Sequence, residues 1–317
     1  MMVDSDVLPD GLWKSLFPKA LSLIDEIREH GTPDPFFTFG GGTVLMLRYG
    51  HRLSKDIDIF VPDPQSLGYV SPRLSDVADT LCNSQYAEDA TYVKLQLPEG
   101  EIDFVASPNL LASAHAYERW DLFGESVRVE TAAEIVAKKM FHRGDKATAR
   151  DLFDMALVIE REPAALIHAQ PFFYRHADIF KQHVSSPSEG FVQQFQDIDT
   201  RSYHPTFEHA AGVAVGYLTQ LQQDLEKSAQ QVRQQAQAQG YTVQATDTAH
   251  GEYVGKVVHA TSHHVLQHLG RNSVAIHEKH RLPVTLHDTA VDTSLHLRYG
   301  HGAALALSKS RSTGIER

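Results

Sequence analysis

The sequence predicts an α/β (α+β) protein: a mixed sheet flanked by helices, a helical extension, and a small β-rich domain at the C-terminal end. Three observations lead to this prediction. Apolar and polar residues alternate at 55–61 and again at 91–106, which is the period of strands that bury one face. Apolar residues take helical spacing at 11–30 and again beyond 131. After residue 250, short β-rich runs are separated by Gly, Asn and Pro, which is typical of a small antiparallel, barrel-like domain.

Length and composition predict a folded chain with more than one domain. At 317 residues, with 42% hydrophobic and 22% charged residues, the chain has enough material for a core and for a second domain. Residues 219–244 hold ten glutamines and few large apolar side chains, so we expect them to contribute little to a core. We therefore predict a main domain over 1–218, a glutamine-rich linker over 219–249 and a β-rich domain over 250–317.

The net charge and the number of cysteines limit the kinds of binding partner and the cellular compartment that the sequence favours. The net charge is −11, although residues 251–317 carry about +3, so the main domain is too acidic to bind nucleic acid non-specifically. A single cysteine, Cys82, cannot form an intramolecular disulfide, which fits a reducing compartment. The start of the chain is acidic, and no apolar run reaches the roughly 20 residues of a membrane span. We expect a cytoplasmic protein without membrane insertion.

Three aspartates fall at positions where their carboxylates could bind a metal ion. Residues 35–42, PFFTFGGG, end an apolar strand in glycines, and a helix is expected directly after them. On the next strand Asp56 and Asp58 share one face, and Asp103, in a hairpin strand, faces away from the apolar row of its own strand. Three such carboxylates can hold one or two Mg²⁺ ions against nucleotide phosphates, which the backbone N–H groups of the glycine turn would also approach.

The alternative interpretation is structural. An isolated Asp-x-Asp pair usually marks a solvated strand face, and a lone run of glycines is a weaker signal still. The combination of glycine turn, helix, Asp-x-Asp strand and third aspartate favours a functional site.

Downstream, Thr131 and Glu134 predict a capping box for a helix that ends at Gly144, and a second helix follows to Pro163.

The residues GGTVLMLRYGHRLSKDIDIF resemble the first motif of the AbiEii/AbiGii nucleotidyltransferase toxin family, within the polymerase-β-like nucleotidyltransferase superfamily. A second stretch, EIVAKKMFHRGDKATARDLFDM, is similar to the later pattern of that family, a helical lysine followed by Arg-Asp-(apolar)-x-Asp. The resemblance covers about residues 35–160. It implies a polymerase-β-like mixed sheet with helical extension and assigns the main domain to nucleotidyl transfer.

The resemblance also implies roles for individual residues. Asp56, Asp58 and Asp103 fall on the metal ligands and, with Lys139 and Asp151, on the catalytic residues. Lys139 would hold nucleotide phosphate, although the adjacent Lys138 leaves that assignment open by one position, and a solvent-facing lysine is the alternative. Asp151 could instead serve only as the third residue of its helix, where a negative charge favours the helix dipole. Substrate-binding positions are Gly41, Gly42, Thr43, Arg48, Arg52, Ser54, Arg150 and Asp154.

The C-terminal part resembles KfrB, a small domain of plasmid-encoded proteins, in YVGKVVHATSHHVLQHLGRNSVAIHEKHRL and the later LHLRYGHG. Histidines are frequent here, and His263, His264 and His268 invite a metal interpretation. Strand alternation separates neighbouring side chains, and no acid or cysteine completes the set, so ordinary core and surface histidines are favoured. The slight positive charge permits contact with nucleic acid or with a protein partner.

Taken together, the resemblance implies a metal-dependent nucleotidyltransferase toxin of a toxin–antitoxin or phage-abortive-infection system. It would use an NTP, with two Mg²⁺ ions, to transfer a nucleoside monophosphate to the 3′ end of tRNA or to a protein. A cognate antitoxin, expected to bind DNA, would restrain it. Two alternatives stay open: a non-catalytic plasmid-maintenance or interaction protein, and an NTP-dependent kinase on the same scaffold.

Overall fold

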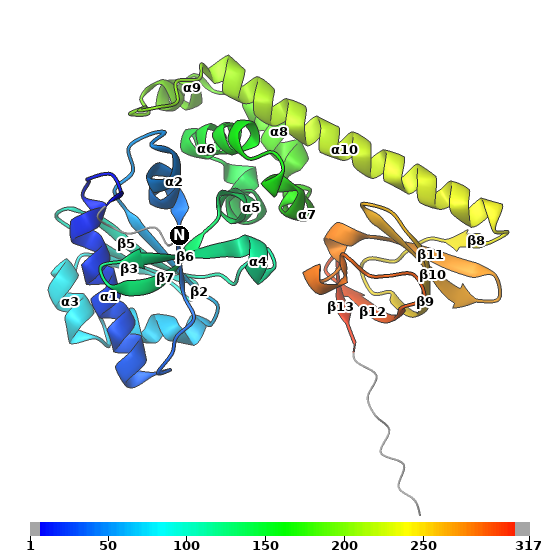
Figure 1. The fold of residues 1–317 in the computed structure, drawn as a ribbon, viewed down its shortest axis with the longest axis horizontal. Coiled ribbons are helices and arrows are strands. Elements are labelled where there is room, and N and C mark those ends of the chain that lie inside the picture. The colour runs from blue at the N-terminus through cyan, green and yellow to red at the C-terminus, as the bar shows by residue number, and fades with distance from the viewer. Residues whose placement is uncertain (1–6, 308–317) are drawn as a thin grey trace, which may run out of the picture. The chain divides into compact units, whose positions relative to one another are not determined.

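A computed structural model describes residues 7–307, which divide into two compact units. The first unit comprises residues up to Ala169 together with Arg175–Val215, and the second comprises Gln170–Tyr174 and the residues from Gly216 onward. The helices are α1 (Trp13–His30), α2 (Gly41–Tyr49), α3 (Asp76–Cys82), α4 (Ser113–Ala116), α5 (Ala132–Arg143), α6 (Ala149–Arg161), α7 (Gln170–Phe173), α8 (Ala177–Ser185), α9 (Glu189–Gln196) and α10 (Phe207–Ala238) (Figure 1).

The first unit is built on a seven-stranded mixed sheet in the order β3-β4-β5-β2-β1-β7-β6, which confirms the predicted fold class. Two neighbouring pairs, β2 with β5 and β1 with β7, are parallel, and the others are antiparallel. The strands are β1 (Thr38–Gly40), β2 (Ile57–Val61), β3 (Tyr86–Glu88), β4 (Tyr92–Leu97), β5 (Gly100–Ala106), β6 (Tyr117–Leu122) and β7 (Glu125–Glu130).

The two faces of this sheet have different roles. Ile57 and Ile59 are buried on the face that packs against α1, where the ring of Phe17 lies 4.8 Å from that of Phe39. Alternation then places Asp58 and Phe60 on the opposite face. Lys138 of α5 lies 3.9 Å from the Phe60 ring on that side. One face therefore supplies core, and the other carries the acids toward α5.

The starts of α5 and α6 show how local sequence sets these helices. Thr131 caps α5 as predicted, because its hydroxyl accepts from the Glu134 N–H. The predicted reciprocal half of that capping box is wrong: the Glu134 carboxylate accepts from the N–H groups of Leu110 and Leu111 instead. A complete capping box forms at α6, between Thr148 and Asp151. The N-terminal ends of α5 and α6 are thus fixed by hydrogen bonds.

The second unit contains a six-stranded sheet in the order β13-β12-β9-β10-β11-β8, with a parallel pair, β11 and β8, among otherwise antiparallel neighbours. The strands after residue 250 pair antiparallel, as expected for that part, and the parallel neighbour β8 comes from the segment predicted as a linker. Its strands are β8 (Thr242–Gln244), β9 (Glu252–Ala260), β10 (His264–Gly270), β11 (Ser273–Glu278), β12 (Ser294–Gly300) and β13 (Ala303–Ala306).

The glutamine-rich segment is ordered helix and strand. It forms the C-terminal half of α10, followed by β8. Val232 and Ala236, one helical turn apart, are buried with Leu266 and Val274 of the sheet. Two small apolar side chains of the helix are enough to form this buried cluster, because the strands supply its other members. The predicted domain boundaries stay predictions, and the segment 219–249 contributes to the second unit.

Candidate active site

The glycine turn between β1 and α2 lies directly against Asp58. Gly41 has φ +72°, and a Cβ atom placed on it would lie 1.9 Å from Asp58 Oδ2. A Cβ on Gly42 would lie 2.6 Å from a terminal nitrogen of Arg52 and 3.1 Å from Ser54 Oγ. The left-handed backbone and these close approaches require glycine. The sequence-predicted turn, Asp58 and Ser54 therefore occupy one location.

The three predicted acids come together at the centre of the sheet. Asp58 of β2 and Asp103 of β5 are paired in register on neighbouring parallel strands, so both side chains lie on the same face. Asp103 Oδ2 lies 2.8 Å from the Lys94 ammonium, whereas Asp103 Oδ1 is buried without a hydrogen-bond partner among the described residues. Asp56 Oδ1 accepts the Glu101 N–H at 3.1 Å.

Electrostatics agree with this convergence. Burial, followed by the neighbouring charge of Asp103, raises the pKa of Asp58 to about 7, and Asp56 adds to the effect. Burial also raises the pKa of Asp103, which Lys94 partly offsets. Mutual repulsion among three carboxylates is what a bound divalent cation relieves. The donor set, all carboxylate oxygen with one buried unpaired atom, fits a hard cation such as Mg²⁺.

The acids are close but not gathered into a preformed cage. Across residues 7–307, the group of three whose ligand atoms lie within 4.8 Å of one another is Glu26, Glu29 and His30, at the surface of α1. Lys94 holds one oxygen of Asp103 in place of a cation. The three aspartates thus stay predicted metal ligands on the basis of shared face and register.

Thr43 and Ser54 form a hydroxyl pair beneath the turn. Thr43 is fully buried, and its hydroxyl lies 2.5 Å from the Asp56 carbonyl oxygen and 3.1 Å from Ser54 Oγ. The carbonyl can only accept, so Thr43 donates to it, and the Ser54 hydroxyl can donate to Thr43. Thr43 therefore ties the start of α2 to the chain just before β2, and this structural role accounts for its hydroxyl.

A second charged cluster faces the acids from α5 and α6. Lys139 Nζ lies 2.8 Å from Asp151 and 2.6 Å from Asp154, and Nε and Nη2 of Arg52 donate to the two carboxylate oxygens of Asp154 at 2.7 and 2.8 Å. Arg143 adds a bond of 2.6 Å to Asp151. These cations hold the pKa values of Asp151 and Asp154 well below their ordinary range despite burial. The positive charges of Lys139 and Arg143 partly offset the rise in the pKa of Asp58, so the two clusters interact electrostatically.

The structure separates the two adjacent lysines. Lys138 is buried, bonds Glu130 at 2.6 Å and lies 3.6 Å from Glu134. Lys139 joins the cluster with Asp151 and Asp154, and two of its three ammonium protons are used there, which leaves one for a ligand. The predicted choice of Lys139 agrees with this placement. Its catalytic role stays a prediction.

Two predicted arginines lie apart from this centre. Arg48 donates to the carbonyl of Glu130, pairs with Glu118 and lies 4.9 Å from the Trp120 ring, which fixes it against β6 and β7. Arg150 is exposed at the second position of α6. These contacts give Arg48 a structural role, and the predicted substrate contacts of both residues stay predictions.

Sequence reasoning missed two participants, Lys94 and Arg143, and it expected His51 to offer positive charge beside the acids. His51 Nε2 lies 2.9 Å from Asp154 Oδ1, and burial lowers the pKa of His51, so it is neutral. Lys94 could have been found, because pairing the hairpin strands around their Pro-Glu-Gly turn places it opposite Asp103. Arg143 offers no such signal, and the partner of His51 could not be predicted, because both contacts depend on how α6 packs.

Comparisons with known proteins agree with this architecture. The model of the AbiEii nucleotidyl transferase toxin family, a type IV toxin–antitoxin system, matches residues 23–247, and the KfrB domain model matches 252–307. No curated protein matches the chain.

Solved structures that match the chain include nucleotidyltransferases of low identity. One from H. pylori, provisionally assigned as a nucleotidyltransferase, is 16% identical, with 69% of this chain and 98% of that chain covered and a TM-score of 0.39. MenT4, a nucleotidyltransferase toxin from Mycobacterium tuberculosis, is 16% identical, with 65% and 84% covered and a TM-score of 0.37. Among residues 7–307, none of the helices combines the length and the apolar character that a membrane span requires.

Since its family model spans well over half of the sequence, the chain belongs to the AbiEii family of nucleotidyltransferase toxins.

Proposed function

We propose that this nucleotidyltransferase uses a divalent cation, Mg²⁺, held by Asp56, Asp58 and Asp103, to transfer a nucleoside monophosphate from an NTP. The observation that carries this proposal is the pairing of Asp58 with Asp103 on one sheet face, with Asp103 Oδ1 buried and unpartnered within the described chain. When bound there, Mg²⁺ would neutralise phosphate charge as it develops in the reaction.

The remaining chemistry belongs to the chain itself. The oxygen of the acceptor forms a bond to the α-phosphorus, the bond between the α-phosphorus and its bridging oxygen breaks, and pyrophosphate leaves. Asp103 would complete the cation site through Oδ1 and would help to activate the acceptor hydroxyl, whose proton would pass to solvent. Backbone N–H groups at the glycine turn and the free proton of Lys139 would bind the triphosphate.

The acceptor we propose is the 3′ end of tRNA, with a protein side chain as the other candidate. The acidic chain disfavours binding to nucleic acid in general, so an RNA end would be bound locally at this site. Growth arrest in the cytoplasm would follow from the modification, within a toxin–antitoxin or abortive-infection system and with an antitoxin as partner. A plasmid-borne setting is suggested by the KfrB-like part.

Labelled nucleotides test the proposal. The purified chain is incubated with total RNA, Mg²⁺ and each NTP, labelled at either the α or the γ position. Label from the α position on RNA or protein is expected, and it should vanish with EDTA or with Asp103→Asn. Asp34→Asn, at an exposed loop carboxylate, is the matched control and should keep wild-type transfer.

The same assay decides between the alternatives. Transfer of γ label alone would identify a kinase and refute nucleotidyl transfer. No transfer of either label with any NTP, from a folded chain, would favour the non-catalytic interaction protein. Transfer that persists in EDTA would refute the metal dependence alone.

A further inference from the structure

A hollow in the second unit combines charged groups that the nucleotidyl transfer reaction does not use. It lies between α10, residues 243–248 and strands β10 and β11, with a cavity volume of about 460 Å³. Such a volume is typical of small-molecule sites. Its polar lining comes chiefly from Arg233, His264, Glu278, Arg281 and Tyr299.

His264 is a buried side chain with one ring nitrogen left for a ligand. It is 2% exposed, and its Nδ1 lies 2.8 Å from the Ser228 hydroxyl of α10. Ser228 Oγ in turn lies 2.6 Å from Thr261 Oγ1. The proposal includes the tautomer in which Ser228 donates to Nδ1 and the neutral ring carries its proton on Nε2. Burial lowers the pKa of His264 to about 4, so the ring is neutral at physiological pH.

A second buried chain fixes what Tyr299 can offer. The Gln267 amide donates to the carbonyls of Gly255 and Leu295, so its Oε1 must accept from His277 Nε2, 3.0 Å away. His277 Nδ1 is then an acceptor and receives the Tyr299 hydroxyl at 2.9 Å. Tyr299 therefore presents only oxygen lone pairs to the hollow.

Positive charge exceeds negative charge along the lining. Arg281 donates to Glu278 at 2.5 Å and to the Gly302 carbonyl at 3.0 Å, so this pair is largely neutralised. Arg233 is exposed on α10 and has no ion pair within residues 7–307. Its charge reaches His264, whose protonation it disfavours. The site thus offers one unpaired guanidinium beside a buried imidazole.

We propose that this hollow binds a small molecule through an oxyanion, a carboxylate or a phosphate, held by Arg233 and the Nε2–H group of His264. Glu278 and Tyr299 supply acceptors for a hydroxyl or amine on the same molecule. Charge-assisted hydrogen bonds from guanidinium to an oxyanion are among the stronger polar contacts. The second unit would then sense a metabolite, independently of the acids of the first unit.

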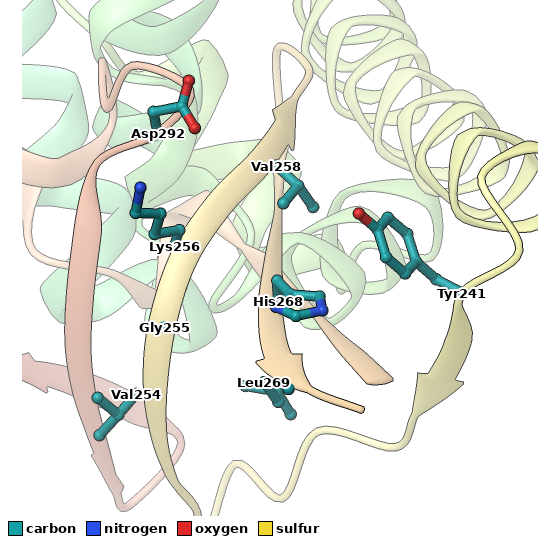
Figure 2. Close-up of a pocket in the computed structure, with 9 residues that line it drawn as sticks. Tyr241, Val254, Gly255, Lys256, Val258, His268, Leu269 and Asp292 are labelled. Carbon is teal, nitrogen blue, oxygen red and sulfur yellow. The ribbon is translucent and has the colours of Figure 1, made fainter. Parts of the chain in front are cut away.

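The same unit provides an internal comparison. A second hollow of about 390 Å³, shown in Figure 2, is bordered by Lys256, His268 and Tyr241 over the backbone of Gly255. His268 there is partly exposed, and among residues 7–307 its ring lies 5.5 Å from that of Tyr241 with no side-chain hydrogen bond. Lys256→Ala therefore removes one positive charge at a hollow without a buried donor, and it is the matched control for Arg233→Ala.

The test is a titration of the full chain with inorganic phosphate and, separately, with acetate, followed by the ring nitrogen signals of histidine in NMR spectra. The His264 signal is assigned by its loss in His264→Gln. We expect an Nε2–H tautomer whose signal shifts on addition of phosphate, acetate or both, which also identifies the preferred oxyanion. Arg233→Ala should weaken binding about tenfold or more, as for one charge-assisted bond.

Lys256→Ala should leave the affinity unchanged. The proposal is overturned if neither anion moves the His264 signal, if that ring carries its proton on Nδ1 in the complex, or if Arg233→Ala binds as tightly as the wild type. Because Arg233 is exposed, its substitution does not threaten folding, and the readout is independent of nucleotidyl transfer.

Discussion

Replacing Gly41 with alanine separates backbone strain from displacement of a candidate catalytic acid. The left-handed conformation at φ +72° costs an alanine about 1–2 kcal/mol of stability. The new Cβ atom would lie 1.9 Å from Asp58 Oδ2, whereas such contacts are essentially never under 3.0 Å. The turn or the carboxylate must therefore move by about 1 Å, a displacement that can cost on the order of 100-fold in rate.

The matched control is Gly124→Ala, in the turn between β6 and β7. Gly124 has φ +80°, and nothing lies within 4 Å of a Cβ placed there. Urea unfolding should show a loss of about 1–2 kcal/mol for Gly124→Ala and at least as large a loss for Gly41→Ala, which adds the close contact with Asp58. Transfer of α-labelled nucleotide should fall about 100-fold only in Gly41→Ala. If Gly41→Ala is destabilised like the control yet keeps near-wild-type transfer, the inference that this turn positions Asp58 for catalysis is refuted.

Three further predictions concern charge and capping. Asp154→Asn leaves Arg52 and Lys139 without their shared carboxylate and should lower the free energy of unfolding in urea by about 3–5 kcal/mol. A loss below about 1 kcal/mol would contradict the inference that this buried carboxylate stabilises both cations. In metal-free buffer, Asp58→Asn should be increasingly more stable than the wild type from pH 4 to 7. The raised folded-state pKa makes the native wild type bind more protons than the unfolded chain there, so its stability falls with pH; a pH-independent difference would refute the raised pKa. Thr131→Ala should lose about 1 kcal/mol from the cap of α5, measured by thermal unfolding, whereas an unchanged midpoint would show the cap is dispensable.

The alternation of residues in the strands predicted most of the relative placement of the three aspartates. Alternation put Asp56 and Asp58 on one face, and the hairpin turned Asp103 to the same side, because side-chain direction in strands follows from sequence alone. The parallel pairing of β2 with β5 did not follow from sequence, since strand order depends on tertiary packing. Confirmation of the family rests on the matching family model.

The helical side of the site was less accessible to sequence reasoning. A helix turns by about 100° per residue, so a phase error of one residue exchanges Lys138 for Lys139, and only packing on the sheet decides between them. The bonds from Arg52 and His51 to Asp154 span more than 100 residues and depend on the docking of α6. Likewise, the few apolar residues of the glutamine-rich segment gave little sign that β11 would accept β8 as a parallel neighbour.

The participation of α10 and β8 in the second sheet bears on how the protein can be divided experimentally. A recombinant fragment that starts at residue 250 would lack Val232 and Ala236 and would leave Leu266 and Val274 facing water. Such a fragment should bind hydrophobic dyes and aggregate. A cut before Gly216 keeps Val232 and Ala236 with the strands that they cover, although it omits Gln170–Tyr174 of the same unit, so this longer fragment should bind less dye than the one that starts at residue 250.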